Sequence, residues 1–256
     1  MRLDEYIRKR LEIKPICLMT HVIFGYPSIE ANWKALEIMA EHQVDLVEIQ
    51  MPFSEPTADG PVFAHANQKA LEHGATVRHY FEFMDKVTSH FNFPVLMMGY
   101  YNMAFKMGEE RFLQQLKNAG GSGFIIPDLP VEAGAPLYRR AGQMELSPIA
   151  FMTPTSPAER LAQNGRAGSG FIYVVARKGV TGAHTHFDTE FQAYIRRCRK
   201  ATNLPLAIGF GISQPEDLAC LVGKVEMAII GTALLKTWER GGERALRQFF
   251  RSIRLR

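Results

Sequence analysis

Cysteine is scarce in this sequence. Its 256 residues include three cysteines, Cys17, Cys198 and Cys220, which lie far apart and form no C-x-x-C pair. An odd and scattered set argues against a disulfide framework and against a metal site built from cysteine. We therefore expect three ordinary, small, buried side chains.

Long apolar runs and a secretion signal are also absent. No apolar run approaches the roughly 20 residues that a helix needs to cross a bilayer. The N-terminal residues MRLDEYIRKRLEIK are too charged for a signal peptide. The sequence therefore predicts a cytoplasmic protein that does not enter a membrane.

An excess of one charge is confined to one segment. The chain has 30 Lys and Arg against 26 Asp and Glu, a net charge of +4. Residues 239–256 hold six Arg and two Glu, which accounts for the whole excess. The remainder is close to neutral, which argues against a broad nucleic-acid surface. With 46% hydrophobic and 22% charged residues, the composition excludes disordered, collagen-like and coiled-coil chains.

The basic segment predicts a terminal amphipathic helix. One face carries arginines at helical spacing and the other carries large apolar residues. The arginines are Arg244, Arg247, Arg251 and Arg254, and the apolar residues are Leu246, Phe249, Phe250 and Ile253. We expect the apolar face to pack on the core and the arginines to be solvated. A nucleic-acid or membrane surface is the alternative.

Short apolar runs alternate with helical patterns along the chain. The runs lack strict alternation, as in parallel strands covered on both faces. They cover residues 17–23, 44–50, 94–100, 123–126, 148–152, 170–176, 204–208 and 225–230. Helical patterns cover residues 29–41, 77–91, 109–119, 132–143, 158–164 and 190–200. Ser156 and Ser213, each followed three residues later by glutamate, predict two capping boxes.

This alternation predicts a (β/α)8 barrel, an α/β fold, with residues 1–256 as a single domain. A doubly wound open sheet is the competing fold, and it usually carries a glycine-rich dinucleotide loop after its first strand. Here Gly25-Tyr26-Pro27-Ser28 follows the first run without that pattern. We therefore favour the barrel, in which active sites form at the C-terminal ends of the strands.

The second predicted strand carries the sharpest functional signal. Leu46, Glu48 and Gln50 share one face of it, and Glu48 is a carboxylate near the end of an apolar run. Burying a carboxylate is costly unless it is paired or neutralised. Such a group suits proton transfer; a structural role in a polar network is the alternative.

The loop that follows, residues 51–61, contains three prolines and is therefore restricted. Rigid placement is what a catalytic group needs. Asp59 lies in this loop before Gly60, although Asp-Gly is also a common turn pair. Together, Glu48 and Asp59 offer two carboxylates in different environments, which could divide acid and base duties.

Other strand ends add aromatic and flexible residues. Tyr100, Asp128 and Tyr173 lie at or near the ends of the third, fourth and sixth runs. Aromatic rings on the inner wall could sandwich a flat ligand ring, with packing of the barrel core as the alternative. Gly209-Phe210-Gly211 and Gly231-Thr232 follow the last two runs, where barrels frequently bind phosphate. Tight turns are the alternative there.

Two further chemistries are disfavoured. His184 and His186 have no third ligand nearby in the sequence, so we expect polar loop residues and no metal site. No lysine lies within a predicted strand, although Lys178 follows the sixth run. A Schiff-base aldolase would need a desolvated lysine inside the barrel. The pattern therefore favours acid/base chemistry.

Taken together, these residues resemble the tryptophan synthase α-subunit family over essentially the whole chain. Residues 48–61, EIQMPFSEPTADGP, are similar to the family signature E-x-x-x-P-F-S-D-P-x-A-D-G-P. The motifs PDLP at 127–130, RKGVTG at 177–182 and GFGI at 209–212 support the resemblance in order and spacing.

The resemblance implies a carbon–carbon lyase of tryptophan biosynthesis. Such a chain cleaves indole-3-glycerol phosphate into indole and glyceraldehyde 3-phosphate with no cofactor of its own. It also implies a β-subunit partner that holds pyridoxal phosphate and receives indole through a tunnel, in an α2β2 assembly. No partner of another kind is implied.

The resemblance also assigns roles to residues. Glu48 is the expected general acid/base, and Asp59 is expected to hold the indole N–H. Thr181 belongs to a mobile lid that helps to orient Asp59, and the Asp128 loop also faces the partner. The residues expected to line the pocket are Tyr100, Asp128 and Tyr173, and those expected to bind phosphate are Gly182, Phe210, Gly211, Gly231 and Thr232.

The sequence departs from the family pattern in several places. Glu55 stands where Asp is usual, Thr232 where Ser is common and Gln50 where Gly is common, and residues 20–27 differ from the usual first strand. None of these changes removes a catalytic group. Three alternatives remain: a stand-alone lyase that releases indole, a non-catalytic regulatory subunit, and a related phosphate-binding isomerase of aminoaldose intermediates. The intact carboxylates argue against the second, and the proline-rich loop argues against the third.

Overall fold

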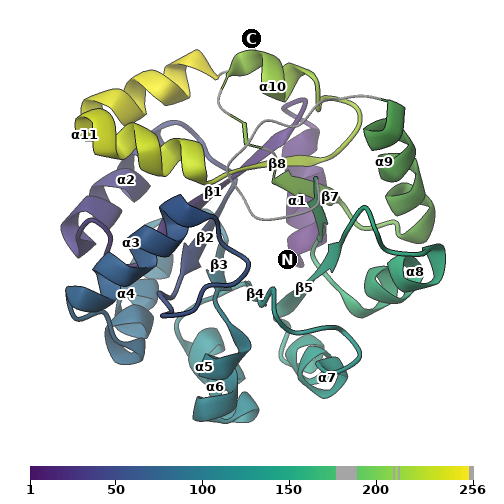
Figure 1. Cartoon of the computed structure of the whole chain (residues 1–256), viewed down its shortest axis with the longest axis horizontal. Helices are drawn as coiled ribbons and strands as arrows, with labels where there is room; N and C mark the ends of the chain where they lie inside the picture. The colour runs from purple at the N-terminus through teal and green to yellow at the C-terminus, as the bar shows by residue number, and fades with distance from the viewer. Residues whose placement is uncertain (177–188, 210, 213, 254–256) are drawn as a thin grey trace.

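Parallel strands close into a barrel with the order β1 to β8 around the ring (Figure 1). The computed structural model describes residues 1–176, 189–209, 211–212 and 214–253. The strands are β1 (Cys17–Ile23), β2 (Leu46–Gln50), β3 (Val95–Met98), β4 (Gly123–Ile125), β5 (Ser147–Met152), β6 (Ile172–Val175), β7 (Leu206–Gly209) and β8 (Met227–Ile230). Strand β8 pairs with β1, so the predicted barrel is confirmed.

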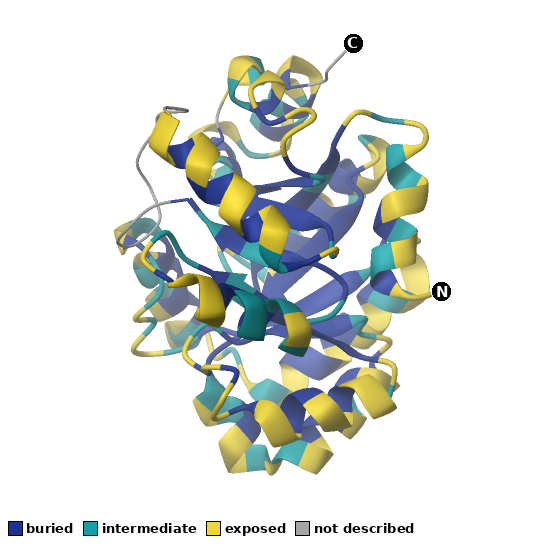
Figure 2. Cartoon of the chain, turned by 90° about the vertical axis from the view of Figure 1, so that its right-hand side faces the viewer, coloured by how far each residue is buried: buried dark blue, intermediate teal, exposed yellow. Residues whose placement is uncertain are grey.

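Helices surround the ring of strands. They are α1 (Leu3–Leu11), α2 (Ile29–Glu41), α3 (Pro61–Glu72), α4 (Val77–His90), α5 (Tyr101–Met107), α6 (Glu109–Asn118), α7 (Ala135–Gln143), α8 (Ala158–Ala167), α9 (Thr189–Ala201), α10 (Pro215–Ala219) and α11 (Thr232–Ser252). Figure 2 shows the buried strands inside and the exposed faces of the helices outside. None of the helices in the described part of the chain is long and apolar enough to span a membrane.

Side chains from alternate strand positions fill the barrel interior, as expected for a closed parallel barrel. This interior cluster contains Cys17, Met19, Leu46, Leu96, Met98, Ile125, Ile149, Phe171, Ala207, Met227 and Ile229. Leu3 and Ile7 of α1 belong to the same cluster. Helix α1 therefore closes the N-terminal end of the barrel and leaves the C-terminal end for the loops.

A buried ion cluster fixes α1 to the strands. The Asp45 side chain is fully buried just before β2, and its Oδ1 lies 2.6 Å from Arg10 Nε of α1. Lys14 Nζ lies 2.8 Å from Asp45 Oδ2, and the Leu18 backbone N–H donates to that oxygen at 2.8 Å. Because Arg10 belongs to α1, Leu18 to β1 and Asp45 directly precedes β2, the cluster joins these three elements.

The predicted C-terminal helix is confirmed as the last part of α11. Leu246, Phe250 and Ile253 are each 1% exposed, so the apolar face is buried. Helix α11 begins earlier than the sequence pattern suggested, and Gly241 and Gly242 interrupt its backbone geometry. Arg247 pairs with Glu41 of α2, so this arginine joins two helices instead of being only solvated.

Several helix boundaries were not predicted correctly. The capping box at Ser156 does not form, because α8 begins at Ala158 with no side-chain cap. Ser156 Oγ instead lies 2.8 Å from Thr153 Oγ1. At α10 the box is formed by Gln214 and Asp217, which puts Pro215 at the first helical position. The helices α1, α3 and α5 were not anticipated.

The cysteine expectation holds for two of three residues. Cys17 and Cys198 are buried free thiols, whereas Cys220 is exposed. Cys220 lies just after α10, at the position that caps this short helix. Its exposure follows from that terminal position, because the core-facing residue of α10 is Leu218.

The ion cluster leads to a stability prediction. Asp45→Asn should lower the free energy of unfolding by about 3 kcal/mol, because it leaves Arg10 and Lys14 beside a neutral buried group. Glu72→Gln, which removes one partner of an exposed ion pair with Lys69, should change it by less than about 0.5 kcal/mol. Urea unfolding of both variants measures the difference. Equal effects would show that the buried cluster does not anchor α1.

Candidate active site

Glu48 lies inside the barrel near the C-terminal end of β2. It is 1% exposed, and its strand neighbours are all buried and mostly apolar. Its Oε1 lies 2.8 Å from His21 Nδ1 of the adjacent strand β1, and the strand register places these two residues opposite each other. The buried carboxylate therefore has a titratable partner.

Asp59 lies in the proline-rich loop between β2 and α3. Gln50 Nε2 donates to Asp59 Oδ2 at 2.7 Å, and Asn67 Nδ2 donates to the same oxygen at 3.4 Å. Burial raises the pKa of Asp59 above its ordinary value, although the Gln50 hydrogen bond and the nearby His21 oppose this shift. The loop thus holds a second carboxylate in a less buried setting than that of Glu48.

One hydrogen-bonded chain links the two carboxylates. His21 Nδ1 contacts Glu48, and His21 Nε2 lies 2.7 Å from Gln50 Oε1. The other end of the Gln50 amide donates to Asp59. The structure therefore brings Glu48 and Asp59 into one network, with His21 and Gln50 between them.

Two of the expected aromatic residues lie beside these carboxylates. Tyr100 accepts a hydrogen bond from the Ala58 backbone N–H at 3.0 Å, and its ring stacks on Phe53 at 5.0 Å. Burial raises the pKa of Tyr100, and the Asp59 charge raises it further. Burial also raises the pKa of Tyr173 well above its ordinary value, with the Glu48 and Asp59 charges adding to the effect.

The position of the Tyr173 hydroxyl requires a glycine at residue 209. A side-chain carbon on Gly209 of the neighbouring strand would lie 2.7 Å from the Tyr173 hydroxyl oxygen. The two residues belong to paired strands, β6 and β7. Glycine at the end of β7 therefore leaves the space that the tyrosine occupies near the carboxylates.

Asp128 has a different setting from the other expected pocket residues. It is exposed, and its Oδ1 accepts a hydrogen bond from the Tyr101 backbone N–H at 2.9 Å. Tyr101 is the first residue of α5, so Asp128 caps that helix from the loop after β4. This interaction joins two loops at the C-terminal end of the barrel.

The structure describes three of the residues that are expected to bind phosphate, Gly211, Gly231 and Thr232. Gly211 has a φ of +67°, a conformation that favours glycine. A side-chain carbon on Gly231 would lie 2.9 Å from the Phe63 ring, and Thr232 begins α11 directly after it. The start of this long helix offers unpaired backbone N–H groups to an anion. Thr181, Gly182 and Phe210 lie outside the described residues, as do Lys178, His184 and His186.

The sequence alone does not single out His21 and Asn67. It places Gln50 on the same strand face as Glu48 and as a departure from the family, but gives it no role. The sequence does contain an indication for His21. Side chains alternate between the two faces of a strand, and His21 lies two residues after Met19 and four after Cys17, which both face the interior. A histidine at the inward-facing end of a barrel strand is therefore a candidate. No group of three or more His, Cys, Asp or Glu suited to a metal occurs among the described residues.

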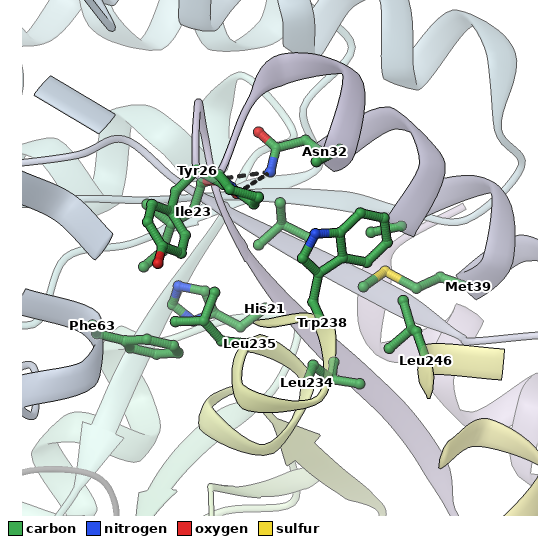
Figure 3. Close-up of a pocket in the computed structure, with 14 residues that line it drawn as sticks. His21, Ile23, Tyr26, Asn32, Met39, Phe63, Leu234, Leu235, Trp238 and Leu246 are labelled. Atoms are coloured by element: carbon green, nitrogen blue, oxygen red, sulfur yellow. Dashed lines mark hydrogen bonds between the residues drawn. The ribbon is translucent and has the colours of Figure 1, made fainter. Parts of the chain in front are cut away.

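An apolar pocket lies behind the network, between β1, α2, α3 and α11 (Figure 3). His21 and Phe63 line one end of it, and Trp238, Met39 and Leu246 line another part. Its lining includes neither Glu48 nor Asp59. Asn32 Nδ2 donates to the Ile23 and Tyr26 carbonyls, which holds the loop after β1 in place.

Comparison with known proteins identifies the family. The sequence model described as Tryptophan synthase alpha chain matches residues 9–253. The tryptophan synthase alpha chain of Desulfotalea psychrophila is 44% identical over 254 residues, covering 99% of this chain and 100% of the relative. That of Methanocaldococcus jannaschii is 39% identical over 217 residues, covering 84% of this chain and 77% of the relative.

Solved structures agree with the sequence relatives. A chain of Mycobacterium tuberculosis tryptophan synthase superposes with a TM-score of 0.91 at 27% identity, covering 98% of this chain and 96% of that one. A chain of the tryptophan synthase complex from Pyrococcus furiosus superposes with a TM-score of 0.83 at 25% identity, covering 93% and 95%. By both the sequence match and the barrel architecture, this chain belongs to the tryptophan synthase alpha chain family.

Proposed function

We propose that this chain cleaves indole-3-glycerol phosphate into indole and glyceraldehyde 3-phosphate, as the α-subunit of a tryptophan synthase. The observation that carries the proposal is the network at the C-terminal end of the barrel, which holds Glu48 and Asp59 together through His21 and Gln50. This reaction is a retro-aldol cleavage, and it needs an acid, a base and a group that stabilises the indole ring.

Glu48 acts as the general acid and base. Breaking the carbon–carbon bond requires a proton on indole C3, which turns the ring into a leaving group. The same carboxylate then takes the proton of the glycerol hydroxyl as the carbonyl of the aldehyde forms. Glu48 suits this role because its carboxylate is almost fully buried and shares a short contact with a histidine.

Asp59 holds the indole N–H. Protonation at C3 places positive charge on the ring nitrogen, and a carboxylate next to it stabilises that charge in a partly dehydrated site. The Gln50 hydrogen bond orients the Asp59 carboxylate within the site. Tyr100 and Tyr173, which lie near these carboxylates, line the indole pocket together with Asp128.

The phosphate binds at the opposite side of the site. Gly211, Gly231 and Thr232 offer backbone N–H groups and a hydroxyl, and the α11 N-terminus favours negative charge there. On the family resemblance we also assign phosphate binding to Gly182 and Phe210, and the orientation of Asp59 to Thr181. This division places the acid/base chemistry and the anion at separate ends of one substrate.

A β-subunit that holds pyridoxal phosphate is the proposed partner, in an α2β2 assembly in the cytoplasm. The exposed Asp128 loop faces it, since this loop lies at the open end of the barrel and Asp128 joins it to α5. Glu55 also lies exposed in the loop after β2. The longer side chain of Glu55 changes this surface relative to the usual Asp.

The general acid/base role predicts a large loss in Glu48→Gln. The amide keeps the size and one hydrogen bond to His21 but carries no transferable proton. We expect kcat for indole formation to fall by about 10²- to 10⁴-fold. An assay of indole release from indole-3-glycerol phosphate measures this. Glu82→Gln in the exposed Arg78 pair is the control; normal turnover in Glu48→Gln would contradict the assignment.

Asp59→Asn should lower kcat by about 10²- to 10³-fold, because a neutral amide stabilises the charged indole ring less well. Since burial raises the pKa of Asp59, its ionised form is lost at a higher pH than for an ordinary aspartate as the solution is acidified. On acidification, kcat of the wild-type chain should therefore begin to fall at a higher pH than an ordinary aspartate would give, and kcat of Asp59→Asn should not show this fall. A pH profile of kcat that is the same in both proteins would contradict this role.

The partner hypothesis separates the heteromeric enzyme from a stand-alone lyase. Indole formation should increase when a tryptophan synthase β-subunit is added, because docking orders the loops at the open end of the barrel. Turnover is measured with the purified chain alone and with the β-subunit in excess. High turnover that the β-subunit does not alter would favour the stand-alone lyase, and activation of the β-subunit without any cleavage would favour the regulatory subunit.

A further inference from the structure

Both ring nitrogens of His21 are engaged inside the barrel. Nδ1 lies 2.8 Å from Glu48 Oε1 and Nε2 lies 2.7 Å from Gln50 Oε1. The side chain is only 6% exposed, and its ring packs against Phe63 with centroids 4.5 Å apart. At such distances each contact requires a hydrogen between the two atoms.

The position of each hydrogen follows from the backbone. The Phe53 backbone N–H donates to Asn67 Oδ1 at 2.9 Å, and Asn67 Nδ2 donates to the Phe63 carbonyl at 2.8 Å. This fixes the orientation of the Asn67 amide. Gln50 must therefore turn its NH2 group towards Asn67 Oδ1, at 3.3 Å, and towards Asp59.

The Gln50 orientation then determines the protonation of His21. Its Oε1 faces the histidine and can only accept, so His21 Nε2 carries a hydrogen. The contact between Nδ1 and Glu48 Oε1 needs a second hydrogen, because otherwise two lone pairs would face each other. This hydrogen belongs either to the imidazole or to the carboxylic acid. The two side chains thus hold one proton more than a neutral histidine and a carboxylate.

We propose that His21 is a positioning residue that stores this proton beside Glu48, so that the two side chains act as one acid/base pair. The inference rests on the proposed function and adds to it the residue that keeps Glu48 ready to protonate the indole ring. Gln50 and Asn67 determine that His21 Nε2 carries a hydrogen, which leaves Nδ1 to share the second hydrogen with Glu48.

The proton balance closes without any co-reactant. Glu48 gives the stored proton to indole C3, and the pair is left as a carboxylate beside a neutral imidazole. The carbon–carbon bond then breaks, and its electron pair returns to the indole ring. The glycerol hydroxyl proton passes to Glu48 as the aldehyde forms. The pair therefore recovers one proton in each turnover.

Charge around His21 supports the pair. Burial alone lowers the pKa of His21, but the charge and hydrogen bond of Glu48 outweigh it, and Asp59 adds to them, so the pKa is raised from its ordinary value. Phe63, which packs on the ring from α3, is apolar. The proton is therefore retained at a pH at which a free imidazole has lost it, and it is released as the pH rises through the raised pKa.

The kinetic test is His21→Asn. Asparagine can keep a neutral hydrogen bond to Glu48 but cannot store a proton. We expect kcat to fall by about 10- to 100-fold, with KM within about twofold, and we expect the alkaline decline of kcat to move to lower pH. The shift follows because an amide donor favours the carboxylate, whereas the lone pair of neutral His21 favours the acid. A decrease in kcat with an unchanged pH profile would reduce His21 to a packing role and overturn the proposal.

Thr20→Val is the matched control. Thr20 precedes His21 on β1, is fully buried, and points its hydroxyl to Met39 Sδ of α2. The substitution disturbs the same strand on the face opposite the site. Its kcat and pH profile should match those of the unaltered chain. A shift of the pH profile equal to that of His21→Asn would show that any change in β1 produces the effect.

A spectroscopic test needs no activity and no folded His21 variant. In the intact chain labelled with 15N-histidine, His21 should carry a hydrogen on Nε2 at every pH and share a second with Glu48 at neutral pH. Glu48→Gln should remove that shared hydrogen and lower the pH at which His21 titrates. Absence of a hydrogen on His21 Nε2 would contradict the proposed acid/base pair, and so would a His21 titration that Glu48→Gln does not change. Absence of cleavage by the wild-type chain with a β-subunit present would overturn the proposed function instead.

Discussion

A carboxylate buried in a barrel strand must find a partner, and the site of this protein depends on how Glu48 does so. The partner is His21, one strand away and in register. Its second nitrogen meets Gln50, whose amide in turn holds Asp59. Because Asn67 is fixed by two backbone groups, rigid main chain determines the geometry of the whole network. Preorganised polar groups of this kind lose little energy to reorganisation during a reaction.

The two ends of the barrel use buried charge for different purposes. At the N-terminal end, Asp45 is surrounded by Arg10, Lys14 and a backbone N–H, so its charge is neutralised and the cluster secures α1. At the C-terminal end, Glu48 faces one titratable group and no fixed cation among its described hydrogen-bond partners. The first arrangement suits stability and the second suits proton exchange. This division matches the general separation of stability and catalysis in such barrels.

Much of the fold was predictable because it is encoded locally. Apolar runs gave the strands, the family-like motif at residues 48–61 indicated Glu48 and Asp59, and helix α2 begins and ends as its pattern predicts. The failures come from contacts between distant segments. Helix α5 begins where Asp128, from another loop, caps Tyr101, and α1 owes its place to Asp45. The position of His21 on β1 predicts only that it faces the interior, and the strand register is needed to show that Glu48 lies beside it.

The cap that Asp128 places on α5 has a mechanical consequence. The loop after β4 and the start of α5 share this bond, and Tyr100, one residue before that helix, accepts from the backbone beside Asp59. A molecule that competed for the Asp128 carboxylate would remove the acceptor of the Tyr101 N–H, one residue away from the tyrosine that supports the Asp59 segment. Asp128 at the C-terminal end of the barrel is thus connected to the Asp59 segment by two hydrogen bonds and the short stretch of chain between Tyr100 and Tyr101. The exposed Asp128 and the segment that carries Asp59 therefore belong to one connected set of contacts.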